Sequence, residues 1–338
     1  MPEEIRFATL NVCNLALPGL RFYDNLDPCT SEEYDAKITW IARMLDRLDA
    51  DVIGLQEIFS QAAVKDVLAK TEKYRQASHL GIEPDPKDGK LTPSVALISR
   101  LPIAGALATY TDLPRNLAVP LPELADSMTR FTRPILHAQV MVSDKLAVNV
   151  FIVHLKSKRP DYRNGEGEDN QAQLGAAVLR SLIRRATEAL GLRYLLTDTM
   201  QGKREPVVMM GDFNDVATAV TTQLVMGLGR SGKNGYDDRL FESYRIQSRR
   251  DPTRDVGFTH MHEGNYETID HVLVSEDFNP ASRFAIGEVL DVTYINDHVV
   301  LTQPEGSDHG AVLVRIRLFD QPRDNGDSAL PPLDLSEE

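Results

Sequence analysis

The sequence predicts an α/β fold in which two packed sheets carry helices on their outer faces. Apolar runs rich in Val, Ile and Leu recur along the chain at strand length, and amphipathic helical stretches fall between them. Strands with an apolar inward face, interleaved with helices, are buried efficiently in such a layered architecture. The chain has 338 residues, of which 42% are hydrophobic and 26% charged. It is therefore long enough for one large core and has the composition of an ordinary globular protein.

Eight apolar runs have the length and composition of strands. Five of them precede the middle of the chain and three follow it. An approximate pattern of a strand, a helix and a strand that ends in an acidic residue occurs in both halves. The predicted strands are 5–12, 51–58, 94–100, 135–142, 146–155, 206–214, 269–275 and 310–319.

Two long segments predict amphipathic helices. The segment 31–50 opens with Ser31 as an expected cap and acidic residues in its first turn, and it carries an apolar stripe at helical spacing. The segment 170–191 has a similar pattern and is expected to end at Gly191. The expected buried stripes are Ile38, Ile41, Leu45 and Leu48 in the first helix and Leu174, Val178, Leu182 and Ile183 in the second.

Polar stretches between these elements predict long surface loops, a location where functional residues often lie. We expect one catalytic domain over 1–319 and a disordered acidic tail over 320–338, which is polar and contains Pro. An insertion at 14–34 either shapes a neighbouring pocket, with Phe22 and Tyr23 available for stacking, or covers its own helix. The predicted loops are 14–30, 81–93, 157–170 and 227–237.

The charge balance disfavours a protein that coats nucleic acid. Lys and Arg number 37 against 50 Asp and Glu, which gives a net charge of −13, whereas such proteins need a basic face. Two cysteines, Cys13 and Cys29, are too few for a disulfide framework, so we expect reduced thiols, with a local bridge as the alternative. No export signal or membrane-spanning run is visible, which predicts a cytoplasmic protein without stable membrane association, with secretion of a trimmed form as the alternative. Nothing in the sequence points to a protein partner.

Polar residues stand at the ends of these apolar strands, where a sheet can bring side chains together at one edge. Taken singly, an Asn or Asp at a strand end is usually a turn former. Taken together, their number and their chemical types indicate one site. These residues are Asn11, Gln56, Glu57, His154, Asp212, Asn214, Asp270, Asp308 and His309.

The segment "EGSDHGAV" (305–312) places a Ser, an Asp and a His in a row. In an extended chain, Ser307 and His309 share one face and Asp308 points to the other. The members of a nucleophilic triad come from separate parts of a fold, so the partners of His309 are expected elsewhere.

The residue types favour a divalent-metal phosphoesterase site. Glu57, Asn11 and Asp308 offer oxygen ligands suited to Mg²⁺ or Mn²⁺, and two histidines without paired Cys or a His-Glu-x-x-His helix disfavour zinc. Asp212 and Asn214, two apart, are expected to activate water and to donate to a phosphoryl oxygen. An Asp270–His309 pair would supply an oriented imidazole.

The motifs "LNV" with Asn11, "IGLQE", "HLKSK", "GDFND", "IDHVLVS" and "SDHGAV" resemble those of the endonuclease/exonuclease/phosphatase superfamily, in its order and over almost the whole chain. The family includes deoxyribonucleases, abasic-site endonucleases, neutral sphingomyelinases and inositol polyphosphate phosphatases. The resemblance implies a four-layered α/β/β/α sandwich of two mixed sheets flanked by helices, and metal-assisted phosphoester hydrolysis.

The resemblance also implies roles for individual residues. Glu57 would be the principal metal ligand, with Asn11 and Asp308 near the ion. Asp212 and Asn214 would handle the attacking water and the phosphate. His309, oriented by Asp270, would be the general base or a phosphate ligand, and His154 would assist the leaving oxygen. Arg133 resembles an arginine that contacts phosphate in the deoxyribonuclease branch but is equally a charge beside a strand. Lys156 would add positive charge near the substrate.

The motifs define the reaction better than the substrate. Met210 before Gly211 disfavours the inositol polyphosphate phosphatases, and His154 disfavours the abasic-site endonucleases. "VHLKSKRPDYRNGEGEDNQAQ" is similar to a bacterial nuclease-like branch. We therefore expect a metal-dependent phosphodiesterase of the endo- or exonuclease type, whose phosphodiester substrate is a nucleic acid or nucleotide. The alternatives are a phospholipid or sphingomyelin phosphodiesterase and a catalytically silent binding scaffold.

Overall fold

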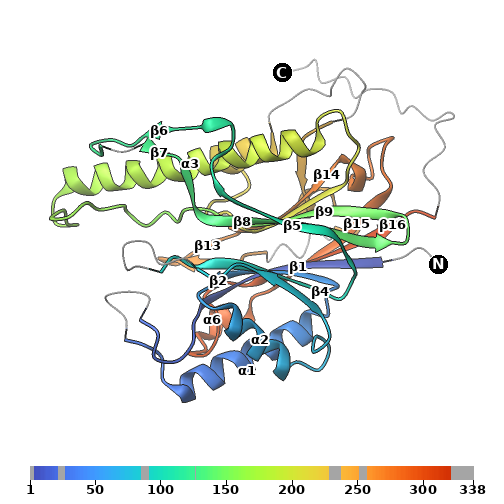
Figure 1. The fold of residues 1–338 in the computed structure, drawn as a ribbon, viewed down its shortest axis with the longest axis horizontal. Helices are drawn as coiled ribbons and strands as arrows, with labels where there is room; N and C mark the ends of the chain where they lie inside the picture. Colours follow the sequence, from blue (N-terminus) through green and yellow to red (C-terminus); the bar gives the residue numbers. More distant parts are fainter. Residues whose placement is uncertain are drawn as a thin grey trace.

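The computed structural model describes residues 4–21, 27–84, 91–125, 127–227, 237–250 and 257–320. Two six-stranded mixed sheets lie face to face at the centre, and helices cover their outer faces (Figure 1). The first sheet has the strand order β15-β16-β1-β2-β4-β3, and the second has the order β11-β14-β10-β9-β8-β5. This arrangement confirms the predicted four-layered α/β/β/α fold.

All eight predicted strands are present, and they form the central part of each sheet. Their observed bounds are β1 Glu4–Leu15, β2 Val52–Ile58, β4 Ser94–Ser99, β8 Arg130–Ser143, β9 Leu146–His154, β10 Val207–Asp212, β14 Asp270–Ser275 and β16 Ala311–Leu318. Within each sheet one pair is parallel, β1 with β2 and β9 with β10. As a result, several strands carry their polar end residues to the same edge.

Several further strands were not predicted, and most lie at sheet edges or in short hairpins. β5 lies at one edge of the second sheet and has no buried residue, so it lacks the apolar signal of a strand. These additional strands are β3 Ser78–Gly81, β5 Ile103–Asp112, β6 Val119–Pro120, β7 Ser127–Met128, β11 Leu240–Glu242, β12 His260–His262, β13 Asn265–Glu267 and β15 Gly287–Ile295.

The helices form the two outer layers. α1 and α2 cover the first sheet, and the long α3 lies across the second sheet (Figure 1). The helical segments are α1 Ser31–Leu48, α2 Gln61–Lys70, α3 Gln171–Met200, α4 Val220–Met226, α5 Ser243–Ile246 and α6 Asp297–Leu301, with short 3-10 turns at Pro114–Asn116 and Glu276–Phe278. None of the helices in the described ranges is both long and apolar enough to cross a membrane.

Three apolar layers hold these elements together. Successive residues of β9 point to opposite faces, so Val150 packs between the two sheets and Phe151 packs under α3. Between the first sheet and α1, Ile41 and Leu45 are fully buried. Each fully buried aliphatic side chain of this kind stabilises the fold by about 1.5–3 kcal/mol. The predicted stripe of α1 is therefore confirmed, since all four of its members are buried.

The long helix α3 differs from its prediction in two ways. It continues to Met200, and Gly191 lies inside it. A Cβ at Gly191 would lie 2.9 Å from the side chains of Leu113 and Phe131, so this glycine permits close packing and does not end the helix. The predicted stripe is also wrong, because Val178 and Leu182 are 46% and 44% exposed. In this part of the helix, the buried face includes Ala177 and Arg180 instead.

The N-cap of α1 is Thr30, one residue before the expected Ser31. The Thr30 hydroxyl accepts a hydrogen bond from the Glu33 N–H, and the Glu33 carboxylate accepts one from the Thr30 N–H. This reciprocal pair is a capping box. The predicted loops are partly described, whereas 22–26, 85–90 and 228–236 lie outside the described residues, as does the predicted tail after Asp320.

Candidate active site

The first sheet contributes two strand ends with unusual backbone conformations. In β1, Cys13 and Asn14 have φ angles of 55° and 60°, and the pairing with β2 shifts register here. Glu57 at the end of β2 has a φ angle of 64°. Left-handed backbone at residues other than Gly costs roughly 1–3 kcal/mol and is concentrated at functional sites. The two bulges let the Asn14 N–H donate to Glu57 Oε2 at 3.0 Å.

Asn11 connects the two sheets. Its Nδ2 donates to Glu57 Oε1 at 3.2 Å, within the first sheet, and to Asp212 Oδ2 at 3.1 Å, at the end of β10 in the second sheet. Its Oδ1 accepts the Cys13 N–H at 3.0 Å. Asn11 and Asp212 are both almost fully buried. The amide therefore links the carboxylates of Glu57 and Asp212 at the shared edge of the sandwich.

The segment "GDFN" orients Asp212 at the end of β10. Asp212 Oδ1 accepts the Asn214 N–H at 2.7 Å, closing a short turn in which Asn214 has a φ angle of 53°. Asn is one of the few residues that tolerates this conformation. The Asn214 Nδ2 donates to the Leu155 carbonyl at 3.0 Å, so its side chain lies against the end of β9. The structure thus brings Asp212 and Asn214 together, as predicted.

His309 has the partner that the sequence predicts. Its Nδ1 lies 2.8 Å from Asp270 Oδ2, and its Nε2 lies 3.9 Å from Asp212 Oδ2. The hydroxyl of Ser307, two residues earlier, makes two backbone hydrogen bonds. The Ser307 hydroxyl donates to the Asn11 carbonyl at 2.6 Å and accepts the His309 N–H at 3.0 Å. Ser307 therefore attaches the last strand to the first and positions His309.

His154 and Arg133 approach the cluster from the second sheet. His154 Nε2 lies 3.4 Å from Asp212 Oδ2, and His154 is almost fully buried. Arg133 donates through Nη1 to the Leu155 carbonyl at 3.0 Å, the same oxygen that Asn214 contacts. The Arg133 Nε and His154 Nδ1 are buried without a hydrogen-bond partner in the described structure. An anion could satisfy the Arg133 donor, which fits the expected phosphate contact.

Burial and neighbouring charges shift the pKa values of this cluster in opposite directions. Burial and the Asp270 carboxylate raise the pKa of Asp212 to about 7, against the opposing effect of His309. Burial alone would lower the pKa of His309, but the carboxylates of Asp270, Asp212 and Asp308 outweigh it and raise this pKa well above its ordinary value. Burial and the positive charges of Arg133 and His309 hold the pKa of His154 well below its ordinary value, so this imidazole is neutral.

The donor set fits a hard divalent cation. At the first-sheet edge the oxygens available to a cation are the Glu57 carboxylate and Asn14 Oδ1, which is buried without a hydrogen-bond partner in the described structure, whereas Asn11 Oδ1 accepts the Cys13 N–H. Oxygen donors of this kind are the ligands that Mg²⁺ and Mn²⁺ prefer. The Asp308 residue is exposed, and its carboxylate interacts with the Cys13 thiol. Desolvation of the carboxylate by its neighbours would raise the pKa of Asp308, but the charge of His309 and the Cys13 thiol hydrogen bond lower it below its ordinary value.

Lys156 does not join the cluster. Its ammonium donates to the carbonyl oxygens of Ser157 and Arg159 within its own loop, and to the Ser181 hydroxyl of α3. Burial and the nearby Arg133 charge lower its pKa to about 8. The next lysine, Lys158, pairs with Glu267 at 3.1 Å. The basic segment therefore makes local contacts, and its role toward a substrate phosphate stays a prediction.

A third histidine, His260, was not identified from the sequence. It lies on β12, and its ring centroid is 4.9 Å from that of His309. The sequence around it indicates only a short hairpin, in which β12 and β13 flank a Glu263–Gly264 turn with φ angles of 49° and 78°. Such a turn is typical of two-residue hairpins.

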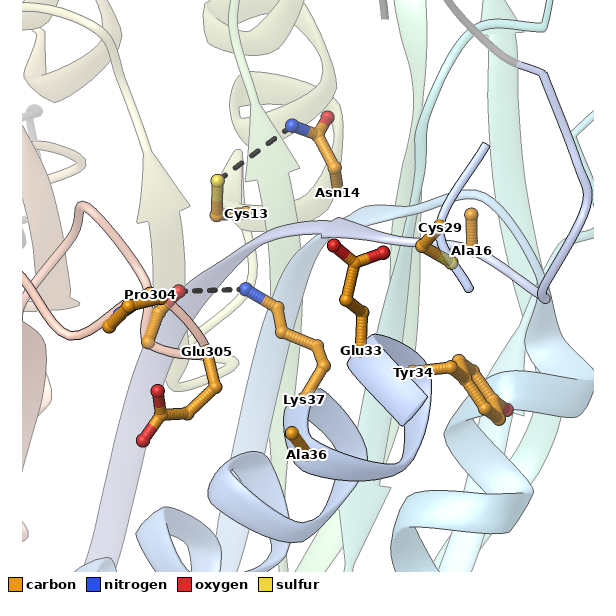
Figure 2. A pocket seen from close by; sticks show the side chains of 11 residues that line it. Cys13, Asn14, Ala16, Cys29, Glu33, Tyr34, Ala36, Lys37, Pro304 and Glu305 are labelled. Carbon is orange, nitrogen blue, oxygen red and sulfur yellow. Dashed lines mark hydrogen bonds between the residues drawn. The ribbon is translucent and has the colours of Figure 1, made fainter. Parts of the chain in front are cut away.

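A pocket of about 380 Å³ adjoins the Glu57 side of this cluster. Figure 2 shows Cys13 and Asn14 of β1 on one side of it and Glu33 and Lys37 of α1 on another. Lys37 Nζ donates to the Gly306 carbonyl at 2.8 Å, and burial lowers the Lys37 pKa. The described part of the insertion thus lines a pocket beside Glu57. Phe22 and Tyr23 lie outside the described residues.

Known structures share this architecture. An endonuclease/exonuclease/phosphatase family protein from Leptotrichia buccalis has a TM-score of 0.54 at 16% identity, covering 92% of this chain and 98% of the other. A Bacteroides thetaiotaomicron mannosyl-6-phosphatase has a TM-score of 0.55 at 17% identity, with coverage of 92% and 99%. The human Nocturnin catalytic domain has a TM-score of 0.54 at 14% identity, with coverage of 94% and 95%. At these identities the likeness shows the fold.

A comparison with curated protein sequences gives no significant match. The model of the Endonuclease/Exonuclease/phosphatase family matches residues 8–309, which is most of the chain. This match includes every residue of the cluster, from Asn11 to His309. The chain therefore belongs to the endonuclease/exonuclease/phosphatase family.

Proposed function

We propose that this protein is a divalent-metal-dependent phosphodiesterase that hydrolyses nucleic acids or nucleotides. The family to which it belongs acts on phosphoester bonds. The observation that carries the proposal is the continuous set of contacts from Glu57 through Asn11 to Asp212, and from Asp212 to His154 and to the Asp270–His309 pair. These contacts support a site in which a cation held by Glu57, the Asp212 carboxylate and the oriented His309 imidazole act together.

Each side chain has a distinct role in this proposal. Asp212 accepts a proton from the attacking water, whose oxygen forms a bond to phosphorus as the bond to the leaving oxygen breaks. Asn214 directs an amide toward the phosphoryl oxygens, although its Nδ2 also holds the Leu155 carbonyl. His309, fixed by Asp270 at 2.8 Å, donates a hydrogen bond through Nε2 to a phosphoryl oxygen that gains charge. Arg133 offers its unpartnered Nε to the same phosphate.

His154 acts as a neutral group. Because its pKa is held well below its ordinary value, it carries no proton for the leaving oxygen, which departs as an alkoxide and takes its proton from solvent water, while His154 Nε2 lies 3.4 Å from Asp212 Oδ2. Glu57 and Asn11, with Asp308, would hold the Mg²⁺ or Mn²⁺ ion. When bound, such an ion neutralises phosphate charge and polarises the phosphorus–oxygen bond.

The substrate assignment depends on the motif after β9, which is similar to that of bacterial nucleases. The net charge of −13 and the local pairing of Lys158 favour short substrates over long duplex DNA, because few free cations would contact the backbone. One protein of this fold is named a mannosyl-6-phosphatase, so the fold alone does not identify the substrate. The test therefore includes nucleic-acid, nucleotide, lipid and sugar-phosphate substrates.

The decisive experiment measures turnover of each substrate with Mg²⁺, Mn²⁺ or EDTA. The panel contains plasmid DNA, RNA, a dinucleotide, a chromogenic phosphodiester, sphingomyelin, inositol phosphates and mannose 6-phosphate. We expect metal-dependent hydrolysis of the nucleic-acid or nucleotide members. We expect Glu57→Gln, Asp212→Asn and His309→Ala each to lower kcat/KM by about 10²-fold or more, in line with the usual contribution of positioned acid–base groups.

The matched control is His262→Gln, since His262 is 72% exposed at its side chain and contacts none of these groups. It should keep wild-type turnover. Hydrolysis that survives EDTA, or wild-type turnover in Asp212→Asn and His309→Ala, would overturn the mechanism. Turnover of sphingomyelin alone would replace the nuclease assignment by a lipid phosphodiesterase. Inactivity toward the whole panel in every metal would favour the binding scaffold.

A further inference from the structure

His260 is paired with His309 through a backbone contact, although the two residues are far apart in the sequence. The two residues form an isolated antiparallel bridge, so the β12–β13 hairpin is attached to the segment that carries Asp308 and His309. Their imidazole rings are tilted by 42° with centroids 4.9 Å apart. This geometry brings a nitrogen from a separate element to the open side of the catalytic cluster.

Three donor groups meet at this position. One ligand atom from each of His260, Asp308 and His309 lies within 4.8 Å of the other two. Asp308 is exposed and His260 is half-buried, so a solvated cation can reach them. Two imidazoles and one carboxylate form a donor set used by catalytic zinc sites.

The hydrogen bond at His309 Nδ1 orients the ring so that Nε2 can bind a cation. Its Nδ1 is engaged by Asp270 Oδ2 at 2.8 Å, which leaves Nε2 as the nitrogen that a cation can bind. A carboxylate behind a metal-binding imidazole fixes the ring orientation and raises its basicity. Asp270 is fully buried and therefore well placed to hold this orientation.

We propose that His260, Asp308 and His309 form a second cation site, selective for Zn²⁺-like transition-metal ions over Mg²⁺. Imidazole nitrogen favours Zn²⁺ and its neighbours in the transition series, whereas Mg²⁺ prefers oxygen donors. The sequence disfavoured zinc because only His154 and His309 were counted, and the structure adds His260 to His309. This site does not use Glu57, but it shares Asp308 with the proposed Mg²⁺ site, so the two ions would compete for that carboxylate. If the proposed function holds, an ion here occupies the His309 nitrogen needed by the phosphate and therefore inhibits the enzyme.

Binding can be measured without turnover, using Co²⁺ as a spectroscopic substitute for Zn²⁺. The wild-type protein in excess Mg²⁺ is titrated with Co²⁺ by calorimetry and by visible absorption. We expect one tightly bound Co²⁺ that excess Mg²⁺ does not displace. His260→Gln should weaken its binding at least tenfold, a loss comparable with or larger than that for supporting residues. His262→Gln, at a residue whose ring centroid lies 6.2 Å from that of His260 on the same hairpin, should change the Co²⁺ affinity much less than His260→Gln does.

Glu57→Gln separates this inference from the proposed function. It should keep Co²⁺ binding while losing Mg²⁺-dependent hydrolysis. Failure of Co²⁺ to bind in excess Mg²⁺ overturns the second site, and this arm needs no variant. Equal Co²⁺ affinity in wild type and His260→Gln, or equal losses in His260→Gln and His262→Gln, also overturns it. Wild-type hydrolysis by Glu57→Gln would instead overturn the proposed function and leave the second site standing.

Discussion

Gly211, directly before Asp212, is a position where an added methyl group should strongly destabilise the fold and displace Asp212. Its φ angle is 149°, and a Cβ there would lie 1.9 Å from the Val153 carbonyl oxygen and 2.9 Å from the Val153 carbonyl carbon. The obstruction is the backbone of the parallel neighbour β9, which cannot rotate away as a side chain could. Gly211→Ala must therefore push β10 away from β9 or change its path.

The expected cost follows from two contributions. The unfavourable backbone angle costs roughly 1–3 kcal/mol, and overpacking of a close-packed interior adds about 1–3 kcal/mol. Gly211→Ala should therefore lower the free energy of unfolding by about 2–6 kcal/mol, a large part of the roughly 5–15 kcal/mol typical of a globular domain. Any folded fraction should also have impaired turnover, because Asp212 moves relative to Asn11 and His154.

Urea unfolding followed by circular dichroism measures this change. The control is Gly175→Ala in α3, where an added Cβ meets no atom within 4 Å. In an exposed helix interior, Ala in place of Gly should stabilise by roughly 0.5–1 kcal/mol. A Gly211→Ala protein whose free energy of unfolding lies within about 1 kcal/mol of the wild type would refute the reasoning.

Three further predictions concern other positions. Asp270→Asn should keep the fold but lower kcat by about 10²-fold or more, because His309 loses its charged partner; turnover and circular dichroism together check this. Ser307→Ala should destabilise by about 1–3 kcal/mol in urea unfolding and should lower turnover less than His309→Ala does, since the Asn11 carbonyl and the His309 N–H lose their partner while the imidazole remains. Burial lowers the pKa of His137, so the folded protein disfavours the protonated imidazole, and the free energy of unfolding should decrease as the pH falls below 6.5. In His137→Gln, the free energy of unfolding should decrease less over the same pH range, as urea unfolding at several pH values would measure.

The layers of the fold were predictable because apolar periodicity reports burial directly. The stripe of α1 and the eight central strands are confirmed for this reason. Edge strands such as β5 were missed because they bury little, so their sequence carries no strong period. Gly191 was misinterpreted because a glycine that ends a helix and a glycine that allows close packing look alike in a sequence. Only the positions of Leu113 and Phe131 distinguish the two.

The candidate site was predictable as a set of residue types at strand ends, and the pairing of His309 with Asp270 agrees with the expectation. The hydrogen-bond partners of each side-chain oxygen and nitrogen in the site could be learned only from the structure. Asn11 was expected as a metal ligand, and its amide nitrogen also joins Glu57 to Asp212. His260 carries no local signal of function, because its neighbour His309 is remote in the sequence and a short hairpin brings them together.

The hydrogen bond between Asn11 and Asp212 has a consequence for the order in which the molecule becomes active. Its two partners are separated by 201 residues, and the Ser307–Asn11 bond spans 296. Contacts of such long range form late, because the intervening chain must first be ordered. A growing polypeptide on the ribosome therefore holds no complete site until the segment with His309 has emerged and docked beside β1. We therefore expect fragments that lack either end of the chain to lack the complete candidate site.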